Sequence, residues 1–153
     1  GVAPVVRMRE RGLTVGFGTD GPSSNNDLDM WEEMRTASLL QKVSTGDPCA
    51  LSAYETLRMA TVVGAKAIGM EGELGIVAPG ARADLLLVDT RRAHLTPCHD
   101  LVANLVYSAK AADVDTVIVQ GNIVVREGEL CGVDLPALRA RAQQRVGEIA
   151  ARP

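Results

Sequence analysis

One loop of this 153-residue sequence carries a carboxylate in a position suited to catalysis. Asp20 follows the short apolar run at residues 13–17 and lies between Gly18 and Gly21. A carboxylate just beyond a buried strand, with glycines that let a ligand approach the backbone, occupies the place where α/β barrels hold their reactive groups. Such a group can bind a metal ion, orient a water molecule or accept its proton. On spacing alone the signal is weak, because an Asp at such a junction more often only caps the loop or a helix.

A helix and a strand are expected to lead into this loop, and a second helix to follow it. Residues 4–11 suit a short helix that ends at Gly12, and residues 13–17 suit a buried strand, an order typical of an α/β unit. Asn26 or Asp27 is expected to cap the next helix. Its apolar side chains recur at three-residue steps along one face: Leu28, Trp31, Met34, Ala37 and Leu40. The only Trp is therefore expected to pack in the core rather than to stack on a nucleobase.

Further along the chain, cap and turn signals predict the remaining elements. Ser52 and Glu55 have the spacing of a capping box for a helix that turns Leu57, Ala60 and Val63 inward. The Gly-rich passage at residues 69–80 marks a domain boundary. Beyond it we predict strands at residues 83–88, 115–120 and 123–126, with a tight turn at Gly121-Asn122. A capped amphipathic helix then starts at Asp134, with one apolar side: Leu135, Leu138, Ala142, Val146 and Ile149.

Composition and charge exclude several classes of protein. Hydrophobic residues make up 46% of the chain and charged residues 23%, as in a soluble globular protein. The formal charge of −3 argues against a nucleic-acid or anionic-membrane partner, since both favour a basic surface. The apolar runs are too short to span a bilayer. Cys49, Cys98 and Cys131 form no CxxC pair, so we expect neither a zinc knot nor a disulfide framework, and a reduced, cytoplasmic compartment.

Four stretches of the sequence, in order across most of the chain, resemble the amidohydrolase superfamily. GTDGPSSNNDLDMWEEMRTASLLQK, residues 18–42, is similar to the last barrel strand and following helix of the branch that contains methylthioadenosine/S-adenosylhomocysteine deaminases and triazine chlorohydrolases. ALSAYETLRMATVVGAKAIG, residues 50–69, resembles the next helix pair, and LGIVAPGARADLLLVD, residues 74–89, resembles the return into a β-sandwich. HLTPCHDLVANLVYSAKAADVDTVIVQGNIVV, residues 94–125, resembles the deaminases in particular. Four matches in register are far more specific than any one.

The resemblance implies an α/β fold in three parts. Residues 1–69 are expected to form the C-terminal end of a metal-dependent (β/α)8 barrel, residues 70–133 the C-terminal part of a small composite β-sandwich, and residues 134–153 a C-terminal helix. The chain is therefore expected to be an incomplete, C-terminal fragment. Its strands have open edges, because neither half closes on itself.

The resemblance also implies a function for the full-length parent. We expect a cytoplasmic hydrolase that deaminates a nucleoside-like heterocycle, S-adenosylhomocysteine or methylthioadenosine, to the inosine analogue and ammonia, while the fragment alone is inactive. One alternative is a related enzyme that acts on guanine or a triazine, since the contacts in the substrate pocket determine which heterocycle is bound. Another class remains open, a non-catalytic assembly or binding fragment with exposed apolar faces. A homo-oligomer of the parent is left open as well.

Carried over residue by residue, the resemblance makes Asp20 the metal ligand and proton shuttle of the family. The metal is a divalent ion, zinc in most members and iron in some. Ser24 and Asn25 are candidate substrate-binding residues, because loop residues near these positions line the pocket in related hydrolases; turn residues that bond their own backbone are an equal alternative. The family's metal also needs histidines, but His94 and His99 have the wrong order and spacing and are expected to be structural. Most ligands should thus lie outside this chain. Three polar residues are expected to serve a helix start: Asn26, Asp27 and Asp29.

Overall fold

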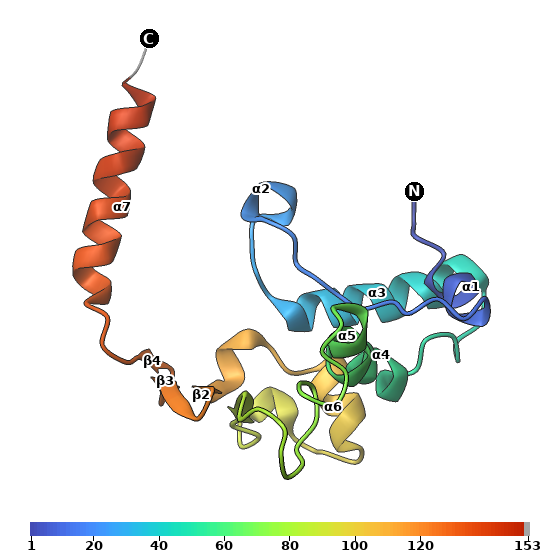
Figure 1. The fold of residues 1–153 in the computed structure, drawn as a ribbon. Coiled ribbons are helices and arrows are strands. Elements are labelled where there is room, and N and C mark those ends of the chain that lie inside the picture. The colour runs from blue at the N-terminus through green and yellow to red at the C-terminus, as the bar shows by residue number, and fades with distance from the viewer. Residues whose placement is uncertain (152–153) are drawn as a thin grey trace.

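The computed structural model describes residues 1–151, which form a helical N-terminal half and a C-terminal half built on a small sheet (Figure 1). The N-terminal helices are α1 (Val5–Glu10), α2 (Pro22–Asn25), α3 (Met30–Thr45), α4 (Ala53–Ala60) and α5 (Val62–Ala67). The strands are β1 (Leu85–Val88), β2 (Val114–Val119), β3 (Asn122–Arg126) and β4 (Glu129–Leu130). Between β1 and β2 lie η1 (Ala93–Leu95), α6 (Leu101–Tyr107) and η2 (Ala111–Asp113), and α7 (Leu135–Ala150) comes last.

The helical half has a mixed apolar and polar core. Helices α3, α4 and α6 pack against one another. Val5, Leu51 and Met59 form a buried cluster, and Val15 and Phe17 pack against it. Three buried polar side chains, which must be hydrogen-bonded to be tolerated there, lie on α3 and α4: Ser38, Gln41 and Thr56.

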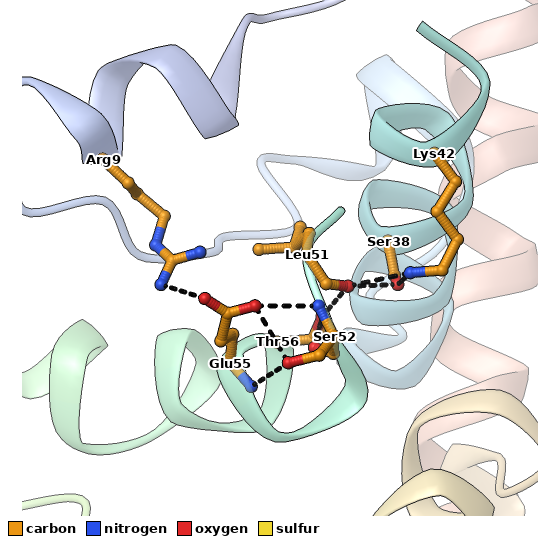
Figure 2. Close-up of polar contacts among 7 residues, drawn as sticks. All are labelled: Arg9, Ser38, Lys42, Leu51, Ser52, Glu55 and Thr56. Carbon is orange, nitrogen blue, oxygen red and sulfur yellow. Dashed lines mark hydrogen bonds and ion pairs between the residues drawn. The ribbon is translucent and has the colours of Figure 1, made fainter. Parts of the chain in front are cut away.

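The carbonyl oxygen of Leu51 joins α3 to α4 (Figure 2). Leu51 is 2% exposed and has a left-handed backbone with φ 48°, which is uncommon for a branched side chain. Its oxygen accepts hydrogen bonds from two side chains of α3, Ser38 Oγ at 2.7 Å and Lys42 Nζ at 3.1 Å. Thr56 Oγ1 of α4 lies 3.4 Å away, but its one proton goes to the Ser52 carbonyl at 2.8 Å. Helix α3 thus holds the strained residue that leads into α4.

Lys42 and Ser38 extend this network to α6. The Lys42 ammonium also donates to the carbonyl of Ala50 at 2.6 Å and to Ser38 Oγ at 3.1 Å, so all three of its protons are used. Ser38 has a single proton, which it gives to Leu51. The 2.9 Å contact between Ser38 Oγ and Tyr107 Oη therefore has Tyr107 as donor. Tyr107 also places its ring centroid 5.9 Å from Lys42 Nζ.

The predicted capping box at the start of α4 is confirmed. Ser52 Oγ accepts from the Glu55 backbone N–H at 3.4 Å, and Glu55 Oε2 accepts from the Ser52 N–H at 2.9 Å. Glu55 also accepts from Arg9 Nη2 at 2.7 Å, which ties α1 to α4 (Figure 2). Burial acts to raise the pKa of Glu55, but the hydrogen bonds from Arg9 and Ser52 outweigh it and hold the pKa below its ordinary value.

The buried strand predicted at residues 13–17 is wrong, because this segment pairs with no strand within residues 1–151. It lies instead against α4 and α5, where a Cβ on Gly16 would be 3.0 Å from Gly64 Cα and 3.6 Å from the Met59 carbonyl. A strand is defined by hydrogen bonds to a neighbour, and the four strands of the sheet pair only with one another.

The cap predicted for the long helix at Asn26 or Asp27 is wrong, whereas the helix-start role expected of Asp29 is confirmed. Asp29, rather than Asn26 or Asp27, caps α3, and its Oδ1 accepts from the N–H groups of Trp31 and Glu32 at 2.8 and 3.4 Å. Asn26 instead ends the separate single turn α2 with φ 68°. The apolar face also differs. Leu28 lies before α3 and is 62% exposed, and Leu40 is 41% exposed. Trp31 is half-buried, and its place in the core stays a prediction.

The sheet is antiparallel throughout, in the order β1-β2-β3-β4. Val119 pairs with Asn122, so the predicted turn shifts back by one residue to Gln120-Gly121, with φ of 50° and 80°. Two positive φ values are typical of a type I′ hairpin turn, whose twist matches the strands. The Glu127-Gly128 turn to β4 has the same signature and was not predicted. The structure is thus a mixed α/β fold with a four-stranded antiparallel sheet.

The C-terminal helix α7 stands apart from the other helices (Figure 1). Its predicted cap is confirmed, since Asp134 Oδ1 accepts from the Ala137 N–H at 2.9 Å. No residue of α7 is buried.

Among the described helices, none has both the length and the apolar character of a membrane span. The division at residue 69 stays a prediction, and α6, beyond it, packs on α3 and α4.

The Gly-rich passage crosses the α4–α5 junction at close range. A Cβ on Gly75, which has φ 74°, would be 2.5–2.7 Å from Thr61 C and O and from Val62 N. Gly80 has φ 88° but open space around it. We expect Gly75→Ala to destabilise the protein by about 3–4 kcal/mol, against about 1 kcal/mol of backbone strain for the control Gly80→Ala. Urea unfolding measures both, and equal losses would show that the backbone contact is unimportant.

Removal of the Lys42 ammonium should also weaken the fold. We expect Lys42→Met to cost about 1–3 kcal/mol, because the Ala50 carbonyl loses a donor and the Leu51 carbonyl loses one of its two donors. The control is Lys66→Met, which removes an exposed 3.4 Å ion pair with Glu71 that contributes about 0–1 kcal/mol. Thermal unfolding compares the two variants. A Lys42→Met protein as stable as the control would contradict the role of this network.

Candidate functional site

The loop that carries Asp20 is fixed at its start by the core and at its end by α3. Phe17 packs against the buried cluster, and Asp29 begins α3 while its Oδ2 accepts from the Ala111 N–H at 3.3 Å. Asp20 itself is exposed and has φ 56°, a left-handed conformation that Asp tolerates better than most residues. The scaffold therefore sets where the loop starts and ends.

Two donors from the same loop hold the Asp20 carboxylate. Its Oδ1 accepts from the Gly21 backbone N–H at 2.8 Å, and its Oδ2 accepts from Ser24 Oγ at 2.7 Å. The Ser24 hydroxyl first, and then the Gly21 N–H, hold the pKa of Asp20 below its ordinary value. The group is thus an anion at neutral pH, as a metal ligand or a proton acceptor must be.

The structure brings Ser24 to Asp20 but turns Asn25 toward α3. Asn25 Nδ2 donates to Glu33 Oε1 at 2.8 Å, and its Oδ1 accepts from the Asp27 N–H at 3.4 Å. Only the contact from the Asp27 N–H is of the kind expected of a turn residue, and the substrate-binding roles of Ser24 and Asn25 stay predictions. The sequence did not predict that Glu33 would bind Asn25. These residues are eight positions apart and lie on two different helices, so no local pattern indicates their contact.

Other carboxylates on this loop and the first turn of α3 influence one another. A hydrogen bond and the negative charge of Asp27 raise the pKa of Glu32, with smaller contributions from burial, Asp29 and Glu33. Repulsion of this kind favours binding of a cation, but no cluster of three or more His, Cys, Asp or Glu side chains within residues 1–151 has the geometry to hold a metal ion. Asp20 can therefore be at most one ligand of a larger set.

A groove in this structure lies away from the candidate site. It has a volume of about 560 Å³ and runs between α5, residues 74–77 and β1. Its lining is largely apolar and includes Phe17, Ala60, Gly64, Ile68, Ile76 and Leu85. None of Asp20, Ser24 and Asn25 lines it. Asp20 thus does not lie in this groove.

The two histidines, which are expected to be structural, differ in their surroundings. His94 Nε2 lies 2.8 Å from Asp113 Oδ2, and Asp113, only 4% exposed, also accepts from the Lys110 N–H at 2.9 Å. Burial acts to raise the pKa of Asp113, but these two hydrogen bonds outweigh it and the pKa is lowered. His94 thus has a structural partner, and His99 is exposed.

Comparison with known proteins gives the context for Asp20. A sequence model described as the amidohydrolase family matches residues 1–124. A 5-methylthioadenosine/S-adenosylhomocysteine deaminase of Pelotomaculum thermopropionicum is 55% identical over 145 residues, which are 95% of this chain and 33% of the relative. A 5'-deoxyadenosine deaminase of Methanothermobacter thermautotrophicus is 54% identical over 85% of this chain and 30% of the relative.

A solved structure extends this similarity to the fold. The adenosine deaminase from Xanthomonas campestris with bound zinc superimposes with a TM-score of 0.96 at 37% identity. The match covers 99% of this chain and 35% of the solved one. This chain therefore spans about a third of the length of the curated relatives it matches.

The contact between His94 and Asp113 predicts a pH dependence of stability. A lowered Asp pKa gives stability that is present above the unfolded-state pKa and lost as pH falls through the folded-state pKa. In His94→Ala the folded-state pKa of Asp113 should rise, so that stability is lost at a higher pH. Thermal unfolding between neutral pH and about pH 3 measures this, with His99→Ala as the control. Identical curves for the two variants would contradict a structural role for His94.

Proposed function

This chain belongs to the amidohydrolase family, and from that premise we propose that it supplies the Asp20 part of the active site of a metal-dependent deaminase. The parent enzyme hydrolyses the exocyclic C–N bond of an adenine ring in S-adenosylhomocysteine or methylthioadenosine, which yields the inosine analogue and ammonia. The 55% identity to a deaminase of these nucleosides, over 95% of this chain, carries the proposal.

The donor chemistry of Asp20 fits one position of a zinc site. An exposed, anionic carboxylate is a suitable oxygen ligand for zinc or iron. Catalytic zinc usually has about three protein ligands. We propose zinc as the metal, which the Xanthomonas campestris structure supports, and place the other ligands in the part of the parent that this chain does not cover. Activity is proposed for the parent and not for these 153 residues alone.

The chemistry that we propose for this chain is proton transfer at the Asp20 carboxylate. When bound, the metal lowers the pKa of a water molecule and so provides a nucleophile at neutral pH. An Asp20 oxygen accepts the proton that the water loses as it attacks the ring carbon, and returns it to the departing amine. Gly21 and Ser24 keep the resting carboxylate ionised, ready for the first transfer, and hold its orientation.

A second substrate, 5'-deoxyadenosine, has nearly equal support. The relative named for that activity is 54% identical, so sequence identity does not separate the two. All three nucleosides share the adenine ring on which Asp20 would act and differ at the 5' position, which other parts of the pocket must recognise. Relative kcat/KM values for S-adenosylhomocysteine, methylthioadenosine and 5'-deoxyadenosine, measured on the parent, decide between them.

We also propose a reducing, cytoplasmic location for the parent. The three cysteines of this chain support it, because all of them are free and exposed: Cys49, Cys98 and Cys131.

Asp20→Asn in the full-length parent tests the proposal. The amide keeps the shape but loses the charge and the basicity, so we expect roughly 10²–10⁴-fold lower turnover, together with reduced zinc content by elemental analysis. Asp27→Asn on the same loop is the control and should retain both. Full zinc occupancy and full turnover in Asp20→Asn would rule the assignment out.

A further inference from the structure

We propose that Ser24 is a positioning residue for Asp20, whose hydroxyl holds the carboxylate in the orientation that binds the metal. This inference rests on the proposed function, and it replaces substrate contact as the main role of Ser24. It concerns residues of this chain alone, because both donors to the carboxylate come from the four residues after Asp20.

The carboxylate is held at both of its oxygens and remains open to a cation. Gly21 donates to Oδ1 at 2.8 Å and Ser24 donates to Oδ2 at 2.7 Å, so rotation about the side-chain bonds would break at least one bond. A carboxylate has about four lone-pair sites, and these two bonds leave sites free on each oxygen. The side chain is thus fixed before any metal binds, at a residue whose left-handed backbone already fixes the main chain.

The single turn of α2 brings the Ser24 hydroxyl to this place. Pro22 begins the turn, the Ser24 N–H donates to the Gly21 carbonyl at 2.9 Å, and the Asn26 N–H donates to the Pro22 carbonyl at 2.8 Å. The bond from Asn25 to Glu33 then attaches α2 to α3. Ser24 is therefore supported from the scaffold and not only from its own loop.

The proton count argues against substrate recognition by Ser24 as a donor. A serine hydroxyl has one proton, and that proton is given to Asp20 Oδ2. To donate to a substrate, Ser24 would have to release the carboxylate at the moment when its orientation matters. Ser23, the preceding residue of the same turn, is exposed, and its hydroxyl makes no hydrogen bond within the described residues. It offers a matched control.

The test uses the full-length parent with four variants, Ser24→Ala, Ser24→Thr, Ser23→Ala and Asp20→Asn. Zinc affinity is measured at one fixed pH by competition with a chromophoric chelator, and kcat and KM are measured separately. We expect Ser24→Ala to weaken zinc binding by about 10–100-fold and to lower kcat with little change in KM, as loss of a partner that orients a ligand does. Ser24→Thr, which keeps the hydroxyl, should restore most of the affinity, and Ser23→Ala should match the wild type.

Each other outcome has a distinct meaning. Unchanged zinc affinity in Ser24→Ala overturns the inference, and a raised KM with unchanged zinc affinity assigns Ser24 to the substrate instead. Failure of Ser24→Thr to bind zinc better than Ser24→Ala also overturns it, because the hydroxyl is then not the group that matters. If Asp20→Asn leaves zinc binding and turnover intact, the proposed function itself fails. If Asp20→Asn loses both while Ser24→Ala keeps both, only the present inference fails.

Discussion

The helical half of this protein depends on one buried backbone oxygen, that of Leu51. A left-handed, branched residue costs on the order of 1–3 kcal/mol and persists only where its surroundings enforce it. Here the surroundings are Ser38 and Lys42 from α3, which donate to the same carbonyl (Figure 2). Because Leu51 directly precedes the cap of α4, its oxygen ties the start of α4 to α3. Tyr107 adds α6 through the Ser38 hydroxyl.

The residues that position the Asp20 loop differ from those that orient its carboxylate. The core that contains Leu51 also receives Val15 and Phe17, so it fixes the segment that leads to Asp20. On the other side Asp29 fixes the start of α3. Within those limits, donors at Gly21 and Ser24 alone orient the carboxylate. A rigid scaffold with a locally held reactive group is the arrangement that precise ligand geometry requires.

Features that depend on neighbours in the chain could be predicted from sequence, and features that depend on distant partners could not. The Ser52–Glu55 capping box and the Asp134 cap follow from side chains three residues from their partners. The strand predicted at residues 13–17 failed because pairing needs a second strand that composition does not reveal. The hairpin turn was off by one residue, since Gln120 takes the positive φ that the Gly-Asn pair suggested for Asn122.

The candidate site shows the same contrast. Asp20 could be chosen because its neighbours resemble a known family, whereas its spacing alone was ambiguous. Its bond to Ser24 spans only four residues. The sequence nevertheless predicted either a substrate contact, because this loop lines the pocket in related hydrolases, or a turn residue bonded to its own backbone, and neither prediction included a bond to the Asp20 carboxylate. The link from Asn25 to Glu33 joins two helices and could be found only in three dimensions.

The uncovered apolar surfaces fit the division between this chain and the rest of its longer relatives. Helix α7 buries no residue and exposes Leu138, Val146 and Ile149, while β1 exposes Leu86 and Leu87. A helix of this length gains most of its stability by packing an apolar face, so these surfaces need a cover. The Xanthomonas campestris structure holds the same fold within 35% of its chain, and the remainder is large enough to provide one. Part of a longer enzyme and an assembly module would both expose such faces, so these surfaces give no separate support to a non-catalytic assembly module.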